Sequence, residues 1–159
     1  MMRELLKRGR EDAESVTELA AALIREPSRG GIDEYGLVLA VAETWLEDHE
    51  LLCRRLYGPD QEEVVGLVCE VVGAVPGPTW VLDACLDTAP FGDESAWSFP
   101  PTAGDVVDGS LRGRGAADSK SGAALFCHIA AAIAPMPIVS RGHCRCCSTS
   151  TSTPASSGV

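Results

Sequence analysis

Asp108-Gly-Ser-Leu-Arg-Gly-Arg-Gly-Ala-Ala-Asp118-Ser-Lys-Ser-Gly122 is the stretch of sequence that decides the fold. Its glycines on either side of Arg114 predict a tight turn. The alanine-rich apolar run that follows predicts a helix over 119–134, ended by two prolines. Asp118 stands immediately before this helix, so the stretch is interpreted as a loop that carries a carboxylate to the beginning of a helix.

Upstream of this stretch, the apolar run Thr-Trp-Val-Leu-Asp-Ala-Cys-Leu predicts a buried strand over 79–86. Cys85 and Asp87 lie where that strand ends, and a long loop rich in proline, glycine and acidic residues follows over 87–108. In open α/β sheets, ligands bind beyond the carboxyl ends of the strands. We therefore expect Cys85, Asp87 and Asp118 to lie together, as a set of thiol and carboxylate groups suited to a cation such as zinc.

The remaining chain before this strand alternates between helical and strand patterns. Apolar residues recur at helical spacing over 12–25 and again over 33–50, and two strands are predicted over 51–57 and 63–75, joined by Gly58-Pro59-Asp60. The alternation predicts a layered α/β domain.

The last part of the chain differs in composition from the rest. No Asp or Glu follows Asp118, and 148–159 contain almost only Ser, Thr, Pro, Ala and Gly. Such a tract buries too little apolar surface to offset its ordering entropy. We expect one domain over 1–137 and a disordered tail over 138–159, a composition that an out-of-frame reading of the gene would also produce.

Charge and composition exclude several classes of function. The net charge of −10, without a stripe of Lys or Arg, argues against binding nucleic acid. No apolar window is long enough to span a membrane, and the charged segment 1–10 does not resemble a secretion signal. Four of the seven cysteines, at 53, 69, 85 and 127, lie in apolar runs, which predicts reduced thiols and a cytoplasmic location.

The two stretches resemble motifs of the zinc metallopeptidase family that includes aminoacylase, succinyl-diaminopimelate desuccinylase, dipeptidases and glutamate carboxypeptidase. In that family a strand ends in His-x-Asp-Thr-x-Pro, and Asp-Gly-x-Leu-x-Gly-Arg-Gly-x-x-Asp-x-Lys-x-Gly follows after a loop with a tryptophan. The chain has Asp87-Thr-Ala-Pro90, Trp97 and an almost unbroken second motif, and the resemblance covers 15–134. It implies a three-layer α/β catalytic domain of the zinc-peptidase type, truncated to its amino-terminal part and without the family's lid and dimerisation domain.

The resemblance also implies a function and a set of site residues. Asp118 would bridge two zinc ions, Asp87 would orient the first metal ligand, and Cys85 stands where the family has a histidine ligand. The implied reaction is metal-dependent hydrolysis of amide bonds in N-acyl amino acids or short peptides. The family's Glu-Glu pair, which supplies the general base, has no counterpart here because no Glu follows Glu94. We therefore expect the chain by itself to be inactive.

Simpler interpretations stay open for each site residue. Asp118 can be a helix N-cap, Cys85 an ordinary buried thiol, and Asp87 a turn residue that follows a strand. The alternative function is a degenerate, non-catalytic family member, or a gene fragment, that binds a small carboxylate metabolite. Dinucleotide and phosphate-loop motifs are excluded, the latter because Ser119 precedes Lys120 where that motif requires glycine.

Overall fold

The computed structural model describes residues 2–135 and 141–149. The helices are α1 (Met2–Glu11), α2 (Ala13–Arg25), α3 (Gly36–Asp48) and α4 (Ser121–Ile133), with short helical turns η1 (Glu94–Ala96) and η2 (Ala116–Lys120). The strands are β1 (Cys53–Tyr57), β2 (Val64–Val72), β3 (Val75–Cys85), β4 (Asp105–Val107), β5 (Ser110–Arg112) and β6 (Arg141–Thr149).

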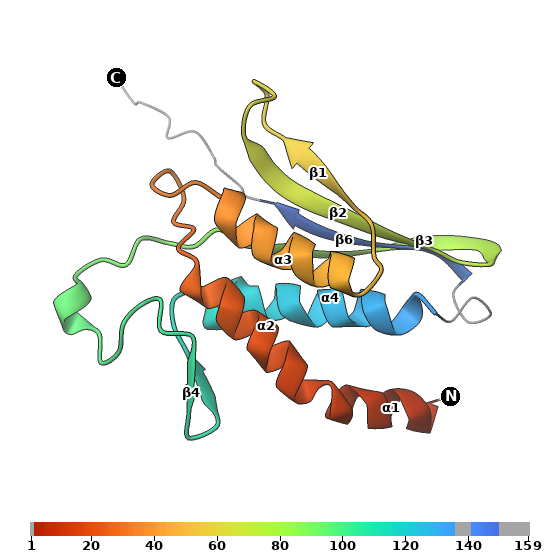
Figure 1. The fold of residues 1–159 in the computed structure, drawn as a ribbon, viewed down its shortest axis with the longest axis horizontal. Coiled ribbons are helices and arrows are strands. Elements are labelled where there is room, and N and C mark those ends of the chain that lie inside the picture. The colour runs from red at the N-terminus through yellow and green to blue at the C-terminus, as the bar shows by residue number, and fades with distance from the viewer. Residues whose placement is uncertain (1, 136–140, 150–159) are drawn as a thin grey trace.

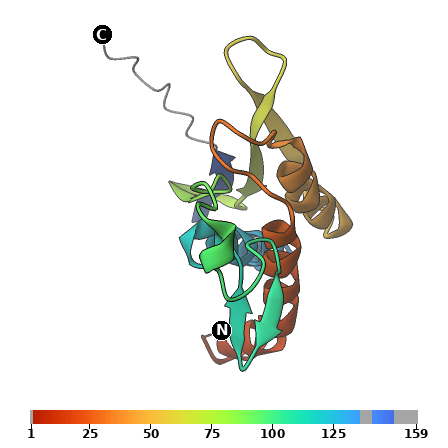
Figure 2. The same cartoon turned by 90° about the vertical axis from the view of Figure 1, so that its left-hand side faces the viewer.

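The main sheet has the strand order β1-β2-β6-β3. β2 runs antiparallel to both of its neighbours, whereas β6 and β3 are parallel. β4 and β5 form a separate antiparallel hairpin beside the main body, which Figure 2 shows below η1.

One face of the main sheet is covered by helices. Figure 1 shows α3 and α4 in front of the sheet, and α2 packs against both of them. On β3, Leu82 and Ala84 face this helical layer, while Val81 and Asp83, which alternate with them, are exposed. Leu23 of α2 and Val38 of α3 are completely buried in the same core. Their burial follows from the helical spacing of the apolar residues on α2 and α3.

The predicted fold class is confirmed. Three predicted helices and three predicted strands correspond to α2, α3, α4, β1, β2 and β3, with boundaries that differ by a few residues. The described residues contribute a sheet and the helices of one of its faces. None of the helices within the described ranges is long and apolar enough to cross a membrane.

Three segments differ from the predictions. The prediction of a disordered tail over 138–159 is wrong for Arg141–Thr149, which form β6 between β2 and β3. Positions 138–140 and 150–159 lie outside the described residues. The loop predicted over 87–108 contains η1 and β4. Helix α1 was not predicted, because a strongly charged segment such as 2–11 has few apolar residues that would mark a buried face.

Candidate metal centre

The loop that carries Asp118 is fastened to the end of β3. The hydroxyl of Ser119 donates a hydrogen bond of 2.7 Å to the carbonyl oxygen of Cys85. The backbone of η2 leaves helical geometry at Asp118 and Ser119, and the peptide bond between them is cis. Asp118 is exposed at this point, so its carboxylate is accessible from solvent.

The structure brings the three predicted site residues close enough to interact. Burial raises the pKa of the Cys85 thiol, and the negative charges of Asp87, Asp83 and Asp118 raise it further. The charges of Asp87 and Asp118 therefore act on the thiol of Cys85, while the role of the three residues as a metal site stays a prediction. Because a thiolate rather than a thiol binds metals, these surroundings make Cys85 a poorer ligand.

One oxygen of Asp87 has no hydrogen-bond partner. Its Oδ1 is buried, as is the unpaired hydroxyl of Tyr35. The pKa of Tyr35 is raised by burial and, to a smaller extent, by the charge of Asp87. A buried carboxylate oxygen of this kind normally has a partner, and a metal ligand with an N–H group would supply one. Cys85 has no such N–H group.

The metal site is incomplete within the described residues. They contain no group of three or more His, Cys, Asp or Glu side chains placed to hold a metal ion. Catalytic zinc takes about three protein ligands and structural zinc about four. Asp118 and Cys85 are two donors, so further ligands would have to come from other residues. A cavity of about 550 Å³ lies between α2 and α3 and is not lined by either donor.

The structure does not support the N-cap alternative for Asp118. Helix α4 begins at Ser121, and its N-cap is Lys120, whose side chain makes no capping hydrogen bond. Asp118 lies two residues before that N-cap, within η2. The position of Asp118 is therefore not explained by capping of α4.

A second loop fixes the segment that follows β3. The hydroxyl of Ser28 donates to the carbonyl of Leu86 at 2.6 Å, and the amide of Thr88 donates to the carbonyl of Ser28 at 2.8 Å. Arg29 pairs with Asp33 at 2.7 Å, and its guanidinium lies 4.5 Å from the centre of the Phe91 ring. The pKa of Asp33 is lowered, chiefly by this hydrogen bond. Ser28 thus has a structural role, because it holds the loop that begins at Asp87.

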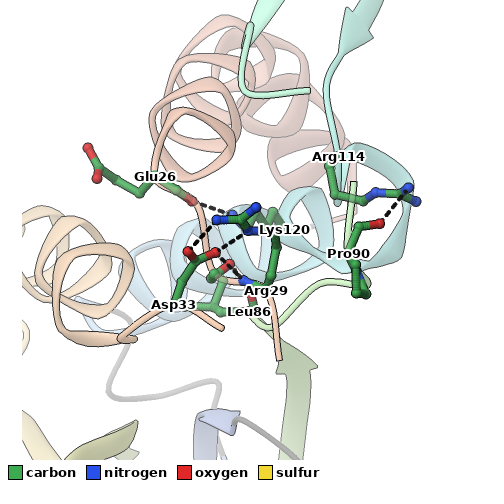
Figure 3. A network of polar contacts seen from close by, with 8 residues as sticks. Glu26, Arg29, Asp33, Leu86, Pro90, Arg114 and Lys120 are labelled. Atoms are coloured by element: carbon green, nitrogen blue, oxygen red, sulfur yellow. Dashed lines mark hydrogen bonds and ion pairs between the residues drawn. The ribbon is translucent and has the colours of Figure 1, made fainter. Parts of the chain in front are cut away.

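Lys120 is a buried charged residue beside the site whose contacts the sequence does not predict. Its side chain is 1% exposed, and its Nζ donates to the carbonyls of Leu23 at 2.9 Å and Glu26 at 2.7 Å. Figure 3 shows this ammonium beside the end of α2 and close to the Arg29–Asp33 pair. In the sequence, Lys120 serves only to exclude a phosphate-loop motif. The backbone carbonyls that it binds have no sequence signature, so only its place in the family motif indicated a specific role.

Arg114 contacts the loop that contains Pro90 and Trp97 and holds it beside the Asp118 loop. Its guanidinium donates to the carbonyl of Pro90 at 3.1 Å (Figure 3). The guanidinium also lies 4.9 Å from the centre of the Trp97 ring. The indole N–H of Trp97 in turn donates to the carbonyl of Phe91 at 2.8 Å. These contacts order the long loop between β3 and β4 next to the Asp118 loop.

Comparison with curated proteins identifies relatives of this chain. Over 109 residues, which are 69% of the chain, it is 36% identical to succinyl-diaminopimelate desuccinylase 1 of Ruegeria sp. (strain TM1040). It is 39% identical, over 115 residues and 72% of its length, to the succinyl-diaminopimelate desuccinylase of Phenylobacterium zucineum. The matched regions cover 27% and 28% of those relatives, so the chain spans less than a third of their length. No protein-family model matches the sequence.

Comparison with solved structures shows the same fold. Human carnosine dipeptidase 1 superposes with a TM-score of 0.71 at 16% sequence identity, covering 99% of this chain and 36% of that one. A dinuclear metal-binding peptidase of the M20 family from Bacillus subtilis has a TM-score of 0.58 at 18% identity, covering 84% of this chain and 34% of the other. The chain thus has the fold of part of an M20 peptidase catalytic domain.

Proposed function

We propose that this chain, a homologue of succinyl-diaminopimelate desuccinylases, supplies metal-binding residues of a hydrolase that cleaves amide bonds in N-acyl amino acids or short peptides. The observation that carries the proposal is the hydrogen bond from Ser119 to the carbonyl of Cys85, which holds Asp118 at the carboxyl end of β3. Ligands of α/β proteins bind at this end of the strands. The substrate class follows the names of the relatives and belongs to the proposal.

In this proposal, the residues of the chain have separate roles. Asp118 supplies the exposed carboxylate that would bridge two metal ions, zinc being the expected metal, and Cys85 supplies the neighbouring donor. Asp87 would orient a neighbouring ligand that carries an N–H group, which Cys85 lacks. A metal ion in such a site polarises the scissile carbonyl and activates water. A general base is also required, and no carboxylate follows Asp118 in these residues, so the base would have to be supplied by other residues. A cytoplasmic location and a small-molecule or peptide substrate are part of the same proposal.

Zinc binding tests the proposal directly. We expect purified chain to bind zinc weakly in isothermal titration, and Asp118→Asn to weaken this binding at least tenfold. Asp60→Asn is the matched control, since Asp60 is an exposed carboxylate in the turn between β1 and β2. Zinc affinity that is the same in wild type and Asp118→Asn would contradict the assigned role of Asp118.

Replacement of Cys85 sharpens the test. A histidine at this position would offer a ring nitrogen to the metal and an N–H group to the unpaired Oδ1 of Asp87. We expect Cys85→His to bind zinc at least tenfold more tightly than wild type, and the additional change Asp87→Asn to remove most of that gain. Equal affinities of wild type and Cys85→His would show that this strand end is not a metal site.

A non-catalytic relative is the second candidate function. Two observations favour it. Cys85 stands where the family has a histidine ligand, and the described residues contain no group of three metal ligands. This candidate predicts that neither wild type nor Cys85→His retains zinc after dialysis. Stoichiometric zinc in the Cys85→His variant, measured by mass spectrometry of the metal, would exclude it.

A further inference from the structure

Three cysteines lie in the core beside β1 and β2, the strands farthest from β3 in the main sheet. Cys69 on β2 is 1% exposed, Cys127 on α4 is 6% exposed, and Cys53 on β1 is half-buried. All three are free thiols. None of them belongs to the loops that hold Asp118, so they are independent of the proposed function.

The register of the sheet pairs two of these cysteines. In the antiparallel ladder of β1 and β2, the Cα of Cys53 lies directly opposite the Cα of Cys69. Residues directly opposite in such ladders have Cα atoms about 4.5–5.5 Å apart, and disulfides span Cα distances of about 4.4–6.8 Å. The backbone therefore already has the spacing that a disulfide requires.

The two side chains also point in the same direction. Opposite residues of neighbouring strands share a face of the sheet, and both cysteines pack into the core beneath the helices. The thiol of Cys53 donates a long hydrogen bond of 3.8 Å to the carbonyl of Leu51. The interaction between the two thiols raises the pKa of Cys53 and lowers the pKa of Cys69, so Cys69 is the member of the pair that more readily forms a thiolate.

We propose that Cys53 and Cys69 are a redox modification site, in which hydrogen peroxide converts the two thiols into a reversible disulfide across β1 and β2. The half-buried Cys53 opens the pair to small oxidants and reductants, whereas bulky reagents are excluded from Cys69. The bond closes a loop from Cys53 to Cys69 and links the edge strand β1 to the centre of the core.

The reaction balances with one peroxide molecule. The Cys69 thiolate attacks a peroxide oxygen, the O–O bond breaks, and the departing hydroxide takes the proton of Cys53 to form water. The Cys53 thiolate then attacks the sulfur of the Cys69 sulfenic acid, the S–S bond forms, and the S–O bond breaks. This second hydroxide takes up the proton that Cys69 had released. Two thiols are oxidised by two electrons in total, and the peroxide is reduced to two waters.

Two other cysteines are the competing partners of Cys69. Cys146 is its register partner on the other neighbouring strand, β6. Cys127 approaches from α4 rather than from a neighbouring strand. Cys53 is favoured over Cys127 because it lies directly opposite Cys69 in the ladder of β1 and β2, and peptide mapping distinguishes it from Cys146.

Peptide mapping identifies the bond. The full chain is reduced, treated with hydrogen peroxide, alkylated and digested without reductant, and its linked peptides are sequenced by mass spectrometry. We expect a Cys53–Cys69 link that dithiothreitol removes, with two fewer free thiols than in the reduced chain. A link from Cys69 to Cys146 or Cys127, or peroxide-treated chain in which Cys53 and Cys69 both stay free, would overturn the proposal.

Matched variants separate the bond from general oxidation. Cys53→Ser should abolish the link, while Cys127→Ser and Cys146→Ser should leave it unchanged. The unfolding temperature of the oxidised wild type should be on the order of 10 °C higher than that of the reduced protein, because the link reduces the number of conformations accessible to the unfolded chain. This difference should vanish in Cys53→Ser, and its persistence there would assign the stabilisation to another modification. Because the mapping uses wild-type chain, its outcome does not depend on whether a core variant folds.

Discussion

Lys120 shows how a single buried charge can position a site that it does not enter. The last carbonyls of a helix lack intrahelical partners and lie at the negative end of the helix dipole. The ammonium of Lys120 satisfies two of them, those of Leu23 and Glu26 at the end of α2. Because Lys120 follows Asp118 by two residues, the same contacts hold the Asp118 loop against α2.

Replacing this lysine tests its structural role. Lys120→Met keeps much of the side-chain volume but leaves the buried carbonyl of Leu23 and the part-buried carbonyl of Glu26 without their charged donor. We expect a loss of about 3 kcal/mol in the free energy of unfolding, measured by urea denaturation. Lys7→Met is the control, because Lys7 is 66% exposed and its ion pair with Glu11 lies at the surface. Equal stabilities of the two variants would show that the contacts of Lys120 contribute little.

Gly115 is the second residue on which the Asp118 loop depends. Its φ is +84°, and a Cβ there would lie 2.8 Å from Cγ2 of Thr88. Gly109 has a similar φ of +74°, with nothing within 4 Å of a Cβ. Both alanine variants are strained, at a cost of about 1 kcal/mol, but only Gly115→Ala also collides with the loop after β3. We expect Gly115→Ala to lose about 2 kcal/mol more than Gly109→Ala in the same unfolding measurement.

At the scale of elements, the sequence predicted those with strong periodicity and missed those with competing signals. The hairpin of β4 and β5 turns at Asp108 and Gly109, which both have positive φ. An Asp-Gly pair is a strong signal for such a two-residue turn. It was overlooked because the same two residues begin the family motif. β6 was missed because its Arg- and Cys-rich composition does not have the apolar alternation of a half-buried strand.

The interface between α2 and α4 contains a buried histidine that makes its stability dependent on pH. Burial lowers the pKa of His128, and the nearby His49 lowers it further, while the carbonyl of Ala124 and the charge of Asp12 act in the opposite direction. The ring also accepts or donates a bond of 3.0 Å with the hydroxyl of Ser15. Because the pKa of His128 is lower in the folded chain than in the unfolded chain, the unfolded chain binds the proton first as the pH falls.

The sign of the effect follows from that order of protonation. The stabilising contribution of neutral His128 is fully present above the unfolded pKa of about 6.5 and is lost as the pH falls toward the folded pKa. We expect the free energy of unfolding to decrease from pH 7.5 to 5.5 in wild type, and His128→Gln to flatten this dependence. His49→Gln should keep a dependence of the same sign, because burial, the largest cause of the lowered pKa of His128, remains. An unchanged pH profile in His128→Gln would contradict the assignment.

At the scale of the whole molecule, the sequence predicts which residues form the candidate site but not the contacts that hold them in place. Cys85, Asp87 and Asp118 could be placed together because strand ends and helix beginnings meet at one edge of an α/β sheet. The pairing of Cys53 with Cys69 could not, because it depends on a strand register that no local pattern fixes in advance. The two carbonyls bound by Lys120 were equally unpredictable, since every residue has one.

The edge strand β3 gives the last prediction, which concerns how whole molecules associate. β3 lies at an edge of the sheet formed by the described strands, and on it Trp80 and Val81 are 68% and 56% exposed. An exposed apolar edge strand offers unpaired backbone groups and apolar surface to another molecule. We therefore expect this chain, purified alone, to associate with increasing concentration in sedimentation velocity experiments, and Val81→Lys to reduce this association. Leu52→Lys is the control, because Leu52 is 88% exposed but lies in the loop before β1. If both lysine variants reduced association equally, general charge repulsion rather than the edge of β3 would be responsible.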